Sequence, residues 1–187
     1  MTAPGQPASV HETSEELAAL DELLARSFDG AGEHLTGIIS PKRRLDARDL
    51  CRYLVGIRHL VVATTTHRGE PRCSAVDGLF FSGSFWFSTS ASSLKATHLE
   101  ARPAISAAHV VGDQVGVFVH GVARVVRGGS DESRRLSPLW REVYGSSPED
   151  WMDDAGDARY VQIVATRLYT YAFDREQFEQ LVAKDGS

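Results

Sequence analysis

The chain has 187 residues, of which 42% are apolar and 24% are charged, a balance that allows one buried core. Its net charge of −5 gives no general attraction to a phosphate polymer or an anionic bilayer, so we expect neither nucleic acid nor a membrane as a partner. Two cysteines cannot build a disulfide framework, and neither a secretory signal nor a membrane-spanning run is visible. The sequence therefore predicts a cytoplasmic protein.

The chain divides into three parts by composition. Residues 1–12 hold almost no large apolar side chains and are expected to form a flexible tail. Residues 13–45 are expected to form a helical arm and its connection, and residues 46–187 the main domain. In the arm, a capping box of Thr13 and Glu16 predicts a helix over 13–27.

From His59 onward the apolar period becomes that of strands. Gly121 inside a strand predicts a bend or a bulge. The strands are expected at 59–66, 71–81, 84–89, 104–126 (two strands around Gly112-Asp113) and 159–173, with helices at 46–56, 92–101, 131–145, a short one after Ser147 and a last one after Asp174. Six strands joined by tight turns predict a mainly β fold, an antiparallel barrel with peripheral helices.

Familiar local signatures of catalysis are absent from the sequence. The chain contains none of the motifs G-x-G-x-x-G, G-x-x-x-x-G-K-[ST], H-E-x-x-H, C-x-x-C or G-x-S-x-G. Its 7 histidines follow no ligand spacing. We therefore predict no metal site, and the sequence identifies no catalytic residue.

The segment 84–99, SFWFSTSASSLKATHL, carries the clearest chemical signal. An aromatic strand delivers Ser88, Thr89 and Ser90 at its end, and the next helix opens with Ser92, Ser93 and Lys95. Hydroxyls, one ammonium and the free amides of a helix N-terminus suit a phosphate group. The alternative is a Ser/Thr-rich turn with an ordinary helix cap.

A second basic residue lies on the preceding strand. Arg72, Ser74 and Val76 alternate onto one face of that strand, which is expected to run antiparallel to the 84–89 strand and next to it. Arg72 is therefore expected to reach the same anion. The alternative is a solvent-facing arginine near the start of a strand.

Several segments together resemble a known family. They read ATTTHRGEPRCSAV, FWFST, SSLKATHL, RPAIS and VHGVARVV, and their order is similar, over about residues 55–127, to that of the pyridoxamine 5′-phosphate oxidase-related split barrels that bind flavin mononucleotide (FMN). The rest of the chain, to the C-terminus, more weakly resembles the actinobacterial flavin- or deazaflavin-dependent oxidoreductase branch of this family. The resemblance implies an antiparallel split β-barrel.

The resemblance also implies roles for individual residues. Ser93 and Lys95 match the S-x-K that contacts the cofactor phosphate, Ser88 and Thr89 match strand-end hydroxyls, and Arg72 matches a strand arginine. Leu94 and Gly116 depart from the vitamin-synthesising members, which carry an arginine and a glutamine there; Gln114 is displaced by two positions and is expected on the same strand face. The expected cofactor-binding residues are Arg72, Ser74, Ser88, Thr89, Ser90, Ser93, Lys95 and Gln114.

The function implied is that of an FMN-dependent oxidoreductase acting on a small molecule by hydride transfer. In the family the site lies between two subunits, so a homodimer is implied, and one or two of Trp86, Trp140, Tyr144 and Trp151 are candidates to wall the ring pocket. Two alternatives stay open: the same class of enzyme with the deazaflavin coenzyme F-420, and a non-catalytic flavin- or haem-binding protein. Leu94, Ala96 and Glu100 interrupt the helix where the anionic tail of coenzyme F-420 would need arginines, which favours FMN.

Overall fold

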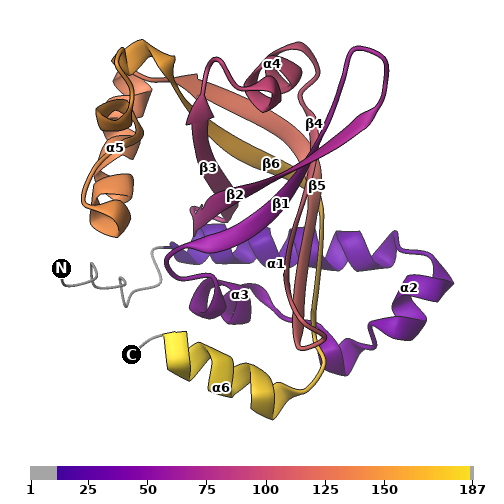
Figure 1. Ribbon diagram of the computed structural model, residues 1–187. Helices are drawn as coiled ribbons and strands as arrows, with labels where there is room; N and C mark the ends of the chain where they lie inside the picture. Colours follow the sequence, from indigo (N-terminus) through magenta and orange to yellow (C-terminus); the bar gives the residue numbers. More distant parts are fainter. Residues whose placement is uncertain (1–11, 186–187) are drawn as a thin grey trace.

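The computed structural model describes residues 12–185, in which six antiparallel strands close into a barrel (Figure 1). The strands are β1 (Arg58–Thr65), β2 (Pro71–Phe81), β3 (Ser84–Ser90), β4 (Ala104–Val111), β5 (Val115–Arg127) and β6 (Ala158–Ala172). Their order around the barrel is β1-β2-β3-β6-β5-β4. Every strand pairs with two neighbours, which closes the barrel and confirms the predicted fold class. The predicted tail falls outside the described residues except for Glu12.

β5 and β6 form the longest pairing, and it is interrupted at Gly121. His120 pairs with Arg167 but Gly121 pairs with Ala165, so the extra residue, Thr166, belongs to β6. A Cβ atom on Gly121 would lie 2.1 Å from the Val164 carbonyl oxygen, which explains why glycine is needed there. The predicted irregularity at Gly121 is therefore confirmed, with the extra residue on the partner strand.

The helices lie outside the barrel, and no helix within residues 12–185 is long and apolar enough to cross a membrane. They are α1 (Ser14–Asp29), α2 (Glu33–Ile38), α3 (Ala47–Tyr53), α4 (Leu94–Ala101), α5 (Asp131–Tyr144) and α6 (Arg175–Asp185), with 3₁₀ turns at Pro41–Arg43, Pro148–Trp151 and Ala155–Asp157.

Two features of the helices differ from the sequence-based expectation. The six-residue α2 was not predicted: its segment has no side-chain cap and no buried residue, so it lacks the signals on which a sequence-based prediction depends. α3 ends at Tyr53 instead of continuing to residue 56, because Gly56 takes φ +72°, a left-handed conformation that a helix cannot contain.

The arm of residues 13–45 packs directly on the barrel. Leu20 and Leu24 of α1 are buried in the main core cluster. Ser27 accepts a hydrogen bond from the Leu168 backbone N–H at 2.9 Å, and the Thr170 hydroxyl donates to the Leu45 carbonyl at 3.1 Å. Both contacts tie the arm to β6, so residues 13–45 share the hydrophobic core of the domain.

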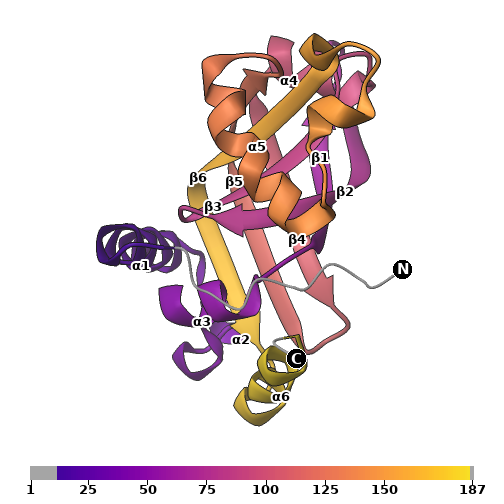
Figure 2. The same ribbon diagram turned by 90° about the vertical axis from the view of Figure 1, so that its left-hand side faces the viewer.

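A second apolar cluster joins α5 to the outer face of the barrel. Trp140 packs edge-on against Phe81 and Tyr160, and Phe81 stacks on Trp86 at 5.0 Å. Figure 2 shows α5 in front of the barrel, with the chain that follows it rising back toward β6. The cluster therefore fixes α5 beside β2 and β3.

Candidate functional site

The candidate site is a cavity of about 260 Å³ that opens where β2 and β3 separate. The two strands pair from Phe81 opposite Ser84 to Gly78 opposite Phe87, and beyond that point β3 continues its pairing with β6 alone. Side chains from β2, β3, α4 and the segment after α5 close around the gap. They are Ala75, Val76, Asp77, Ser88, Thr89, Lys95, Tyr144, Trp151 and Met152.

Hydroxyl groups gather at the end of β3, but of the predicted ones only Ser88 and Thr89 line the cavity, whereas Ser90 and Ser93 do not. Thr89 donates a hydrogen bond to Ser93 at 3.0 Å, and the Ser90 and Ser92 hydroxyls lie 2.8 Å apart. Ser93 also caps α4, because its hydroxyl accepts from the Ala96 N–H at 3.2 Å. The two alternatives from the sequence, a hydroxyl cluster and an ordinary helix cap, are therefore both present, because Ser93 takes part in each.

Lys95 supplies the positive charge of the cavity. It sits in the first turn of α4 and is half-buried. Within the described part of the chain it forms no ion pair. An unpaired ammonium beside the Ser88 and Thr89 hydroxyls offers a full positive charge and groups that can donate to the oxygens of a phosphate. The residues present therefore fit a phosphate-bearing group.

Two contacts hold β3 and α4, the elements that carry the hydroxyls and Lys95, against the start of β6. Arg159, which is paired with Thr89 across β3 and β6, forms an ion pair with Glu100 of α4 at 2.9 Å. The Ala91 N–H donates to the Asp157 carbonyl at 2.7 Å. These contacts attach both ends of the 91–100 segment to the start of β6, so α4 and β3 keep a fixed relation.

Arg72 and Ser74 lie outside the cavity-lining set. Arg72 is exposed and pairs with Glu70 at 2.8 Å near the β1–β2 turn, opposite Thr64. Ser74 lies two residues further along the same strand, opposite Val62. Because β2 and β3 separate at Gly78, neither residue has a partner on β3 in the register. The structure therefore does not bring them together with Lys95.

Gln114 lies in the β4–β5 turn and not on a strand, contrary to the expectation. Its N–H donates to the Val111 carbonyl at 3.0 Å, and its own carbonyl accepts from the Phe173 N–H at 2.8 Å. The turn starts at Gly112, which has φ +52°. β5 has 13 residues and spans about 40 Å, and the cavity lies at its other end, so Gln114 does not reach the cavity within one chain.

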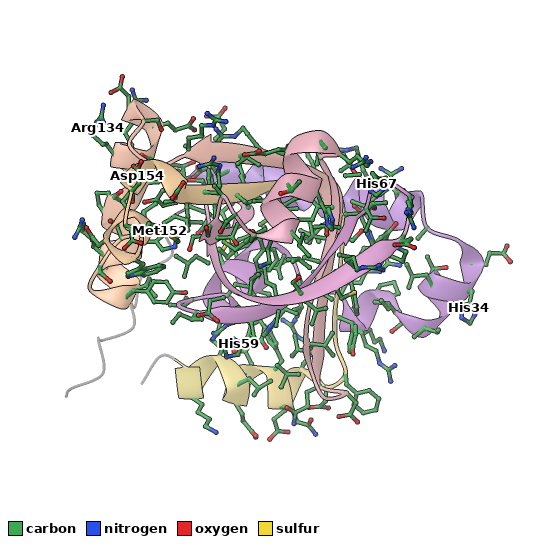
Figure 3. The ribbon with its side chains drawn as sticks, turned by 45° about the horizontal axis from the view of Figure 1, so that its top comes forward. His34, His59, His67, Arg134, Met152 and Asp154 are labelled. Atoms are coloured by element: carbon green, nitrogen blue, oxygen red, sulfur yellow. The ribbon has the colours of Figure 1, made fainter. Side chains whose placement is uncertain are left out.

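Of the four aromatic candidates, two line the cavity. Tyr144 and Trp151 meet edge to face, with ring centroids 5.4 Å apart and an interplanar angle of 81°. Trp86 and Trp140 are instead buried in the cluster under α5. Met152, labelled in Figure 3 on the segment after α5, completes this wall.

The sequence analysis missed Asp77, which lines the same cavity. Burial, and then the nearby Asp77 carboxylate, raise the pKa of Tyr144 well above its ordinary value. His59 Nδ1 lies 3.0 Å from the same carboxylate. The one signal in the sequence was that Asp77 precedes Gly78. That signal could be interpreted only once the structure showed that β2 and β3 separate at Gly78.

No group of three or more metal-ligating side chains gathers among residues 12–185.

Comparison with known proteins agrees with this geometry. A family model described as pyridoxamine 5′-phosphate oxidase matches residues 51–172. No curated protein matches the chain.

Solved structures with the same fold have been given different roles. The conserved hypothetical protein Rv2991 from Mycobacterium tuberculosis is 25% identical over 64% of this chain and 80% of that one, with a TM-score of 0.53. The haem storage protein HutZ from Vibrio cholerae is 18% identical over 64% and 89% of the two chains, with a TM-score of 0.55. A structure named F420 reductase is 17% identical over 62% and 92%, with a TM-score of 0.50.

Proposed function

Because this chain belongs to the pyridoxamine 5′-phosphate oxidase family, we propose that it binds FMN in the cavity at the end of β3 and acts as an oxidoreductase. One observation carries the proposal: the Ser88 and Thr89 hydroxyls and the unpaired Lys95 ammonium line one cavity beside the N-terminus of α4. Arg72 and Gln114 have no part in the proposed site within one chain.

Each part of the chain has a defined task in this proposal. Lys95 neutralises the phosphate, Ser88 donates a hydrogen bond to its oxygens, and the amides of α4 add partial positive charge. Thr89 donates to the phosphate once its hydroxyl proton turns away from Ser93. Tyr144 and Trp151 form the aromatic part of the cavity, where a small-molecule substrate would meet the ring. Bound FMN would supply hydride transfer to or from a small molecule, so the task of the protein is to bind the cofactor and to orient the small molecule beside it.

The charges in the cavity favour FMN over the deazaflavin coenzyme F-420. Among the described residues that line it, Lys95 is the one cation and Asp77 the one carboxylate. One lysine matches one phosphate group, whereas a long anionic tail needs further positive charge. A haem needs an axial ligand; no histidine or cysteine within residues 12–185 lines the cavity, and Tyr144 and Met152 are the lining residues of types that can ligate haem iron.

We further propose that the site is completed in a homodimer. A cavity of about 260 Å³ is smaller than the pockets of about 300–1,000 Å³ that usually enclose ligands of this kind. The outer barrel surface also exposes three large aliphatic side chains on β1, β4 and β5, namely Val61 (52% exposed), Val110 (49%) and Val122 (43%). A second subunit would cover this surface and supply the missing wall.

FMN titration into the wild type and Lys95→Ala tests the cofactor site. Loss of a charge-assisted hydrogen bond to phosphate is expected to weaken FMN binding between about tenfold and about 100-fold. Lys184→Ala is the matched control, because it removes the same charge from the exposed end of α6. Equal affinities of the wild type and Lys95→Ala would remove Lys95 from the site and leave the Ser93 segment as an ordinary helix start.

A further inference from the structure

Asp77 places a negative charge in the cavity that the FMN phosphate does not use. Its carboxylate is half exposed and lies 3.0 Å from His59 Nδ1 and beside the Tyr144 hydroxyl. A carboxylate offers about four acceptor positions, and these two neighbours occupy only part of them. Asp77 therefore keeps acceptor capacity toward the cavity that it lines.

The two aromatic rings beside Asp77 form a right-angled corner. Tyr144 and Trp151 meet edge to face at 81°. The Trp151 Nε1–H donates to the Ser146 hydroxyl at 2.6 Å, which fixes the orientation of the indole. Trp151 is nevertheless 45% exposed, so its ring is not covered by the protein's own core. The corner presents ring surface to whatever enters the cavity.

A carboxylate next to aromatic ring faces is chemistry that attracts a cation. The carboxylate contributes charge, and the negative faces of the rings attract an ammonium group within about 6 Å of their centroids. A second anion at this place would be repelled by Asp77. The cavity thus carries two charges of opposite sign on different elements, Lys95 on α4 and Asp77 on β2.

We propose that the Asp77, Tyr144 and Trp151 corner binds an organic cation, a protonated or quaternary amine without a phosphate group. The role of this cation as the substrate of bound FMN rests on the proposed function, whereas the binding of the cation does not. Asp77 sets the specificity by charge, and the two rings set it by shape. Met152, next to Trp151, bounds the same corner.

Calorimetric titration with choline tests this proposal, with the uncharged isostere 3,3-dimethylbutanol as the matched probe. Choline is expected to bind the wild type at least about tenfold more tightly than the isostere, and Asp77→Asn is expected to lose that preference. Trp151→Leu is expected to weaken choline binding also, because it removes a ring face. Asp153→Asn, an exposed carboxylate on the same segment that does not line the cavity, is the control.

Repeating the titration with FMN separates this proposal from the proposed function. Choline binding with no FMN binding would contradict the proposed function and leave the cation site standing. FMN binding without any preference for choline over the isostere would overturn the cation site alone. If Asp77→Asn weakened FMN binding as much as choline binding, or if FMN displaced choline, Asp77 would belong to the cofactor site and the inference would be wrong.

Discussion

The contrast between Lys95 and Arg72 shows how much a single residue depends on its neighbours. Both are basic and both were expected to contact one phosphate. The structure gives Arg72 a carboxylate partner in Glu70, whereas Lys95 lines the cavity without an ion pair in the described chain. A sequence cannot distinguish these cases, because the distinction depends on where β2 separates from β3.

We expect Arg72→Ala to change FMN affinity by less than about fivefold, because an exposed ion pair contributes little and lies off the cavity. Fluorescence titration of FMN, run beside Lys95→Ala, measures the difference. A loss for Arg72→Ala as large as that for Lys95→Ala would place the Arg72 guanidinium on the phosphate. That result would show that Arg72 leaves Glu70 and pairs with the phosphate when the cofactor binds.

At the scale of the elements, the segment that follows α5 depends on two acidic residues. Burial opposes ionisation of Glu149, but hydrogen bonds from Tyr160 and from nearby serines outweigh it and lower its pKa. The backbone and hydroxyl of Ser147, together with Arg141, lower the pKa of Asp150. Both carboxylates hold the short turn that carries Trp151.

Acid is therefore expected to destabilise this segment. A pKa that is lower in the folded state than in the unfolded state gives stability that is complete above the unfolded value, about 4, and is lost as the pH falls through the folded value. The free energy of unfolding, measured in urea, is expected to fall from about pH 5 to about pH 3. Glu149→Gln is expected to be less stable near neutrality and to show a shallower fall, and an unchanged slope would contradict the assignment.

Most elements were predictable because their signals are local. The capping box of Thr13 and Glu16, the Ser130 and Asp174 caps and the two-residue period of the strands each depend on a few neighbouring residues, and all are present. Gly121 was recognised as irregular for the same reason. The helix α2 was missed because it has no side-chain cap and buries nothing. The predicted 46–56 helix ran on to Gly56, because the sequence shows the glycine but not its left-handed conformation.

The candidate site was predictable only in part. The hydroxyls and Lys95 come from one continuous segment, so a local motif found them. Asp77, Tyr144 and Trp151 come from three elements, β2, α5 and the 3₁₀ turn Pro148–Trp151, and only the packing of α5 on the barrel brings them together. Gln114 was misplaced because a displacement of two residues moved it from a strand into the turn after Gly112.

At the scale of the whole molecule, the proposed homodimer links assembly to cofactor binding. A two-fold dimer that shares the FMN site would be stabilised by FMN through mass action. We expect sedimentation equilibrium to show a dimer, and we expect FMN to lower the dissociation constant of that dimer. A double variant, Val61→Asp with Val110→Asp, is expected to shift the protein toward monomer and to weaken FMN binding, because it puts charge on the exposed aliphatic surface.

A stable monomer that binds FMN at full strength would contradict the shared site and favour a pocket contained in one barrel. As a control, Lys184→Ala changes charge on α6, which contributes neither to the cavity lining nor to β1, β4 and β5, and is expected to leave the dimer unchanged.

The central claim is that the cavity at the end of β3 selects FMN. The most direct measurement offers the purified protein equal concentrations of FMN, coenzyme F-420 and haem, removes unbound ligand, and determines the mass and visible spectrum of what is retained. The account predicts FMN alone, one per chain, and its loss in Lys95→Ala. Retention of the deazaflavin or of haem in place of FMN, or equal retention of FMN by Lys95→Ala, would contradict it.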